Sequence, residues 1–163
     1  MAKGRLLLVL LAAPLLLGSG SRAMQAHSAR PVDDSIERYV HDLSIDDRSD
    51  RLYAARVLRA RLRIVVREAE RARPGSVRED EALAALDDFE VLVAPACIEA
   101  LGVENVAPHC ADILGLLEHA PAEAPLAALL APEAQGSGRL RRHAAQALER
   151  IRAALPLPAP ATP

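Results

Sequence analysis

The sequence is poor in aromatic residues. Tyrosine and phenylalanine make up 2% of its 163 residues, and tryptophan is absent. This scarcity argues against a β-sandwich or barrel, whose strands favour aromatic and β-branched residues. It also argues against a protein that binds single-stranded nucleic acid by stacking the bases on aromatic rings. Alanine, leucine, arginine and glutamate, which favour helices, are abundant instead. Because 51% of the residues are hydrophobic, we expect a single all-α domain with its own core.

Basic residues are missing from a long central stretch. Residues 79–138 contain no lysine or arginine and twelve acidic residues. The segment 48–73 has nine arginines against three acidic residues, and four of the arginines recur at i, i+4 spacing, as a ridge on one helix: Arg59, Arg63, Arg67 and Arg71. Two interpretations stay open. In the first, the ridge is solvated, or it is neutralised by the acidic residues that follow it, Glu79, Asp80, Glu81, Asp87 and Asp88, because surface charge runs are common and individually weak. In the second, it binds an acidic partner or anionic lipid headgroups, and the role of the acidic stretch 79–133 stays open.

One uncharged hydrophobic run stands near the start of the sequence. Lys3 and Arg5 precede the run from Leu6 to Leu17, and Ser21-Arg22-Ala23 has small residues at the positions that a signal peptidase reads. This order is typical of a secretory signal peptide, and the run is shorter than the roughly 18–20 residues of a spanning helix. We therefore expect residues 1–23 to be cleaved after Ala23, which exports the protein to the periplasm or out of the cell. The alternative is a retained segment that tethers the protein to a membrane.

Cleavage would change the charge balance. Lys3, Arg5 and Arg22 leave with the segment, so that 17 of the 20 basic residues remain against 22 acidic ones, a net charge of −5. A duplex nucleic acid demands a surplus of positive charge to neutralise its phosphates. We therefore expect no nucleic-acid partner.

The spacing of apolar residues predicts a series of helices in the domain at 32–154. They are expected at 33–43, 46–73, 76–89, 94–101, 105–119, 121–131 and 139–154. Ser76 and Glu79 have the spacing of a capping box, while Asp33 or Asp34 and Asn105 are candidate N-caps. A flexible lead-in at 24–31 precedes the helices, and the proline-rich residues 155–163 are expected to form a disordered tail.

Similar segments recur along the chain. Residues 94–101 align with residues 124–131 at an offset of 30, and residues 109–114 align with residues 143–148 at an offset of 34. An earlier cognate of the second pair lies at residues 53–58. Periods of this size are typical of stacked helical pairs, in which each pair buries its apolar face against the next.

These segments resemble the HEAT-repeat family, particularly short bacterial HEAT-like proteins. The second helix of that repeat has an arginine three residues before a pair of small residues, followed by a leucine. Two stretches match: Arg51-Leu52-Tyr53-Ala54-Ala55 with Leu58, and Arg141-Arg142-His143-Ala144-Ala145 with Leu148. The middle copy departs from the pattern, with Ala107 in place of arginine and Cys110 in place of alanine. The resemblance implies a short α-solenoid of about three helical hairpins, with an inserted helix near 76–89, and an irregular helical bundle is the rival architecture.

The two cysteines lie on the two helices of one expected hairpin. Cys97 and Cys110 are equally far from the turn between Val103 and Glu104, so antiparallel helices would bring the thiols to the same height. Small neighbouring residues allow the close approach that a disulfide needs, and an oxidising compartment permits the bond. The alternative is a pair of buried, unreactive thiols.

Common catalytic motifs are absent from the sequence, including G-x-S-x-G, G-x-G-x-x-G, the Walker loop and H-E-x-x-H. We therefore expect no catalytic residue, metal or cofactor, and interpret the chain as an exported, monomeric scaffold or adaptor for a protein partner. The partner would contact the second helices of the hairpins, where the candidate residues are Arg56, Arg59, Arg63, Arg141, Arg142 and His143. The alternative function is a small enzyme or metal-binding protein centred on Cys97, His109 and Cys110.

Overall fold

Helices supply all the regular secondary structure in the residues that the computed structural model describes, 35–134 and 136–155. The all-α prediction is therefore confirmed for this part of the chain. These residues belong to one compact unit, and no helix within the described ranges is long and apolar enough to cross a membrane. The predicted signal peptide at 1–23, the lead-in at 24–31 and the tail from residue 156 onward lie outside the described residues.

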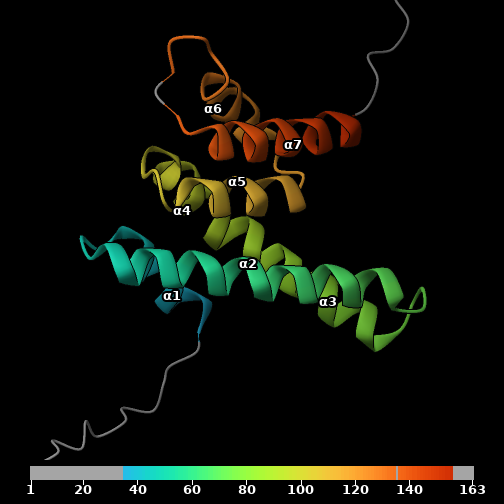
Figure 1. The fold of residues 1–163 in the computed structure, drawn as a ribbon. Helices are drawn as coiled ribbons and strands as arrows, with labels where there is room; N and C mark the ends of the chain where they lie inside the picture. Colours follow the sequence, from blue (N-terminus) through green and yellow to red (C-terminus); the bar gives the residue numbers. More distant parts are fainter. Residues whose placement is uncertain (1–34, 135, 156–163) are drawn as a thin grey trace, which may run out of the picture. The chain divides into compact units, whose positions relative to one another are not determined.

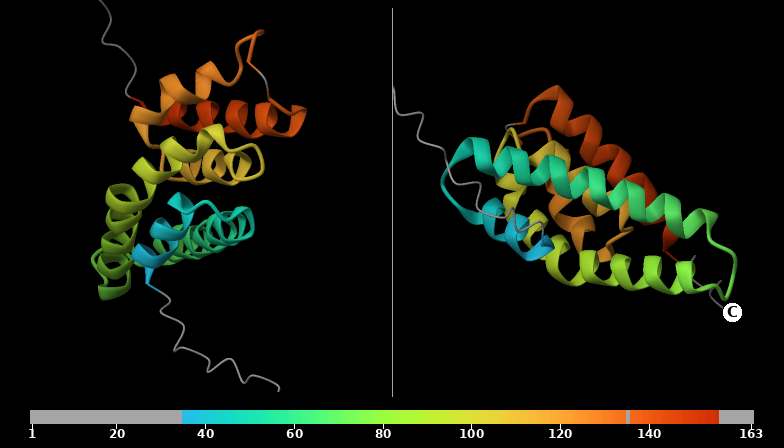
Figure 2. Two further views of the ribbon diagram at one scale, coloured as in Figure 1. Left: turned by 90° about the vertical axis from the view of Figure 1, so that its left-hand side faces the viewer. Right: turned by 90° about the horizontal axis from the view of Figure 1, so that it is seen from below.

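The helices pack in pairs. Their order is α1 (Ile36–Ser44), α2 (Arg48–Arg71), α3 (Val77–Asp88), a π-helical turn (Phe89–Val93), α4 (Ala94–Glu99), a 3₁₀ turn (Ala100–Gly102), α5 (Ala107–Leu116), a second 3₁₀ turn (Ala120–Ala122), α6 (Glu123–Ala128) and α7 (Gly138–Ala154). Helix α1 packs against α2, α4 against α5, and α6 against α7. Helix α5 contacts both α2 and α7 and lies between them (Figures 1 and 2).

The central position of α5 explains its burial. Every residue from Ala107 to Gly115 is buried, and the α5 side chains Ile113 and Leu114 are fully enclosed. Leucines at matching positions of the three similar segments, Leu58, Leu114 and Leu148, are all buried. Burial of each such side chain contributes about 1.5–3 kcal/mol to folding.

Helices α5 and α7 come closest at Gly115. A Cβ atom on Gly115 would lie 2.7 Å from the Cα atom of Ala147 and 2.8 Å from its Cβ atom. Real Cβ atoms do not approach other carbons this closely, so only glycine fits at this position. The contact joins the last two helix pairs almost backbone to backbone.

The helix predicted at 76–89 does not end there. Helix α3 continues through the π-helical turn into α4, and the Ala94 N–H donates to the Phe89 carbonyl, five residues back. The widened turn lies directly before Pro95, which has no N–H and whose ring would clash with the carbonyl four residues earlier in a regular α-helix. The predicted break between 89 and 94 is therefore wrong, because the chain passes the proline without leaving the helical path.

The predicted caps agree with the structure in part. The Ser76 side chain accepts from the Glu79 N–H at 3.3 Å, as predicted, but the Glu79 carboxylate accepts from the Gly75 N–H instead of the Ser76 N–H. Asp33 and Asp34 lie outside the described residues, and Ser35 caps α1. The predicted cap at Asn105 is wrong, because α5 begins after Val106 without a side-chain cap.

The end of α5 also differs from the prediction. The helix ends at Leu116 and not near His119. Glu118 adopts a left-handed backbone conformation with φ of 52°, and the His119 N–H donates to the Leu114 carbonyl at 3.1 Å. Glycine or asparagine normally marks such a helix end, and neither occurs there to reveal it in the sequence.

Candidate functional site

The charged centre of the described structure is Asp112 on α5, which is only 7% exposed. Its Oδ2 atom accepts a hydrogen bond of 3.0 Å from the Arg59 guanidinium on α2 and lies 3.6 Å from that of Arg63. Its Oδ1 atom accepts from Nδ1 of His143 on α7 at 2.6 Å. One carboxylate therefore connects the middle helix to both of its neighbours. Because a buried carboxylate without partners is costly, these contacts are what make its position tolerable.

This centre changes the interpretation of the arginine ridge. Arg59 and Arg63 contact Asp112, so the first half of the ridge is neutralised from α5 and not by the acidic residues of α3. Among the described residues, none of the five predicted partners on α3 forms an ion pair with the ridge, and Glu79 and Asp80 lie in the first turn of that helix. No local pattern in the sequence indicates this pairing, because Asp112 lies 53 residues from Arg59.

A second feature is a pocket of about 260 Å³ next to the charged centre, which we call the basic pocket. It lies where the first turns of α2 and α7 meet the loop before α5. Its lining residues are Arg48, Leu52, Arg56, Glu104, Asn105, Pro108, His109, Ser137 and Arg139. Three arginines from two helices thus face one acidic residue, Glu104, which is exposed.

Two polar side chains of the basic pocket are unsatisfied. His109 is only 3% exposed, and its Nδ1 atom has no hydrogen-bond partner among the described residues. The buried Nδ2 atom of Asn105 likewise has none there. Burial and, to a smaller extent, the charges of Arg59, Arg139 and Arg56 together lower the pKa of His109 to about 4, against an opposing effect of Asp112.

The predicted partner-binding residues fall into separate places. Arg59, Arg63 and His143 contact Asp112, whereas Arg56 lines the basic pocket. On α7, the Arg141 guanidinium donates to the Ala134 carbonyl at 2.8 Å, and Arg142 is exposed. The role of these six residues in binding a partner stays a prediction.

The two cysteines form a buried thiol pair in the structure. Cys97 and Cys110 are free and fully buried, on α4 and α5. Hydrogen bonding to Cys110 raises the pKa of the Cys97 thiol well above its usual value, and burial raises it further. A nucleophilic cysteine needs a lowered pKa and an accessible sulfur atom, so these surroundings favour unreactive thiols. Disulfide formation between them stays a prediction.

The alternative function required a cluster of ligands or catalytic groups. Within residues 35–134 and 136–155, no group of three or more histidine, cysteine or acidic side chains is arranged to hold a metal ion. His119 contacts Glu90, with its Nδ1 atom 3.3 Å from a carboxylate oxygen. The alternative function centred on Cys97, His109 and Cys110 stays a prediction.

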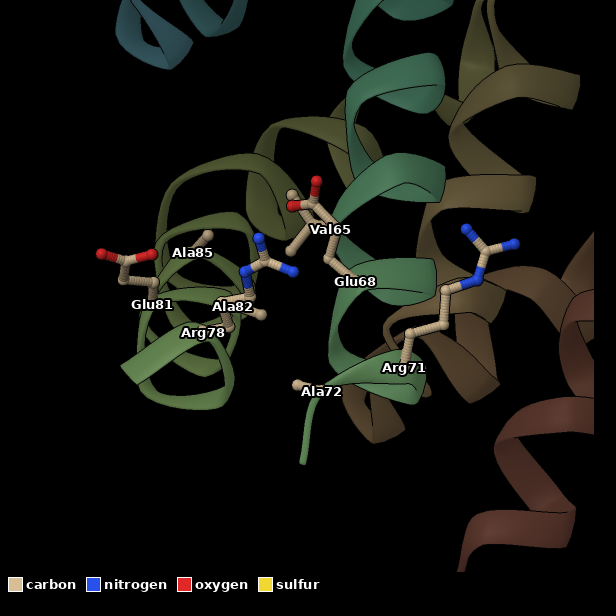
Figure 3. Close-up of a pocket in the computed structure, with 8 residues that line it drawn as sticks. All are labelled: Val65, Glu68, Arg71, Ala72, Arg78, Glu81, Ala82 and Ala85. Atoms are coloured by element: carbon tan, nitrogen blue, oxygen red, sulfur yellow. The ribbon is translucent and has the colours of Figure 1, made fainter. Parts of the chain in front are cut away.

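Another cavity, of about 460 Å³, lies between α2 and α3, and we call it the α2–α3 groove. Val65 and Ala72 of the α2 side and Ala82 and Ala85 of α3 supply its small apolar lining (Figure 3). Each helix also adds one acidic and one basic residue, and these are Glu68, Arg71, Glu81 and Arg78. None of the four charges forms an ion pair among the residues that the structure describes.

Comparisons with known proteins give no relative: no protein-family model, no curated protein and no solved structure matches the chain.

Proposed function

We propose that this protein is a non-catalytic interaction module whose α2–α3 groove binds an amphipathic helix of a partner protein. The observation that carries the proposal is the combination of a small apolar lining with four charges that have no ion-pair partner within the described ranges. Small side chains allow a helix to approach closely, and charges without internal partners can pair with complementary charges on a partner.

The charge pattern defines the partner. Glu68 favours a basic residue on the bound helix, and Arg78 favours an acidic one. Glu81 and Arg71 project to the outer sides of α3 and α2 (Figure 3), where they would meet charges at the edges of the bound helix. The groove therefore suits a helix with charges of both signs beside its apolar face, rather than a polyanion. Figure 3 shows the Arg78 guanidinium projecting from α3 into the space between the two helices.

The wider interpretation follows from the sequence. We infer that the paired helices are HEAT-like hairpins of a short solenoid, which supports the groove as a rigid scaffold. The stacking of α2, α5 and α7 and the matching burial of Leu58, Leu114 and Leu148 support this inference. We further propose that the protein is exported after cleavage behind Ala23, and that it acts as a monomer without a cofactor.

A peptide-display experiment on the purified chain tests the groove. We expect a library of helical peptides to yield binders that have an apolar stripe flanked by charges of both signs. Ala85→Phe would fill the groove and weaken these binders about tenfold or more, a loss of about 1.4 kcal/mol or more. The matched control is Ala84→Phe, because Ala84 is exposed, neighbours Ala85 and does not line the groove.

The outcome that contradicts the proposal is equally clear. If Ala84→Phe and Ala85→Phe change the affinity of the selected peptides by the same factor, the peptides bind elsewhere. Circular dichroism of both variants checks that the added ring has not unfolded α3.

A further inference from the structure

We propose that the basic pocket is a binding site for a phosphoryl group, separate from the α2–α3 groove. The arginines and the unsatisfied side chains of the pocket converge on one cavity of about 260 Å³. Its occupant would be inorganic phosphate or the phosphate of a small monoester or lipid headgroup.

The three arginines of the basic pocket have no partners within the described part of the protein. Arg48, Arg56 and Arg139 line the pocket, and none of them has an ion pair or a side-chain hydrogen bond among the described residues. Arg59 and Arg63, by contrast, are already occupied by Asp112. Like charges held close together repel one another unless an anion lies between them, so the pocket concentrates positive charge that the protein itself leaves uncompensated.

Two buried nitrogen atoms of residues that line the pocket lack hydrogen-bond partners among the described residues. These are the Nδ1 atom of His109 and the Nδ2 atom of Asn105. Leaving a buried polar group unsatisfied costs about 1–3 kcal/mol. An oxyanion in the pocket would accept from the Asn105 amide and from His109, and would remove this cost.

The arrangement of the donors bears on the shape of the ligand. The potential donors come from three segments: the first turns of α2, the loop and first turn of α5, and the start of α7. A planar carboxylate accepts best from one bidentate arginine, whereas a tetrahedral dianion accepts from several directions at once. The N-termini of α5 and α7 add the positive ends of two helix dipoles.

Binding should be coupled to protonation of His109. The groups that face its ring are Arg56 and Arg59 on α2, Arg139 on α7, Asp112 on its own helix, and the anion. An anion would oppose the three arginine charges that disfavour the imidazolium. The pKa of His109, about 4 in the free protein, should therefore rise in the complex, and affinity for a dianion should increase as the pH falls.

Isothermal titration of the full chain with inorganic phosphate tests the site. We expect one saturable site in the wild-type protein, and a loss of affinity of about tenfold or more in the double variant Arg56→Gln/Arg139→Gln. Arg150→Gln is the matched control, since it is an exposed arginine about 16 Å further along α7 than Arg139. Vesicles with and without phosphatidic acid, tested on the same variants, distinguish a lipid headgroup from a free phosphate.

A second readout uses sulfate, whose charge stays constant over the relevant pH range. Sulfate affinity should increase between about pH 7 and about pH 5 in the wild-type protein, and this increase should vanish in His109→Gln. The proposal is overturned if neither phosphate nor phosphatidic acid binds saturably, or if the double variant and Arg150→Gln lose affinity equally. The peptide binding assigned to the α2–α3 groove is measured separately, so each proposal can fail without the other.

Discussion

The tight contact between α5 and α7 makes Gly115→Ala a sharp test of the fold. The added Cβ atom would lie 2.7 Å from the Ala147 Cα atom, about 1 Å inside the normal contact distance between carbon atoms. Overpacking of a dense interior costs about 1–3 kcal/mol. The atom that the new Cβ meets belongs to the backbone and cannot move aside cheaply, so the cost lies in the upper part of this range, at about 2–3 kcal/mol. Alanine regains up to about 1 kcal/mol of helix propensity over glycine, so we expect a net loss of about 1–2 kcal/mol in the free energy of unfolding.

Urea denaturation followed by circular dichroism measures this loss, and thermal unfolding should show a decrease in Tm of about 4–8 °C. Gly138→Ala is the control, because a Cβ atom at the start of α7 would meet nothing within 4 Å. We expect that variant to be as stable as the wild-type protein, or more stable by a few tenths of a kcal/mol. If Gly115→Ala is as stable as Gly138→Ala, the close approach of the two helices is refuted.

Three further changes probe the charged centre, His109 and the buried thiol pair. Asp112→Asn should lower the free energy of unfolding by about 1–3 kcal/mol in urea denaturation, because it leaves partly buried cations without their carboxylate, while Asp87→Asn on the exposed surface of α3 should have little effect. Because the pKa of His109 is lowered in the folded state, the unfolded chain binds the extra proton first, so the free energy of unfolding should fall as the pH drops from 6.5 towards 4. His109→Gln should flatten this pH dependence, whereas the exposed His41→Gln should not. Equal pH dependence in the wild-type protein and both variants would contradict the assignment. Protein purified under reducing conditions should expose both thiols to Ellman's reagent only after unfolding, and rapid labelling of the folded protein would disprove their burial.

Local signals allowed much of the helical structure to be predicted. Ser76 and Glu79 marked the start of α3 because a capping box depends on residues three positions apart. The leucines at 58, 114 and 148 indicated buried faces, since their spacing within each helix reports on one side of it. The break predicted before Pro95 is wrong, because a π-helical turn lets the helix continue past the proline. No residue pattern in the sequence indicates such a turn.

The candidate sites depend on contacts between distant residues, and sequence alone could not reveal them. Asp112 meets Arg59 and His143 across 53 and 31 residues. The basic pocket likewise collects Arg48, Asn105 and Arg139 from three segments. The residue type of Asn105 predicts a helix cap, whereas in the structure its buried Nδ2 atom has no hydrogen-bond partner among the described residues.

Helix α3 buries only Ala82, whereas α5 is buried along nearly its whole length. Helix α3 packs mainly against α2 and against the π-helical turn at Phe89–Val93. The amide hydrogens of α3 should therefore exchange faster than those of α5. One wall of the α2–α3 groove can therefore open without disturbing the centre of the molecule. If the groove binds a partner helix as proposed, one compliant wall would let it accept helices of different width, so that charge would decide the choice of partner more than shape.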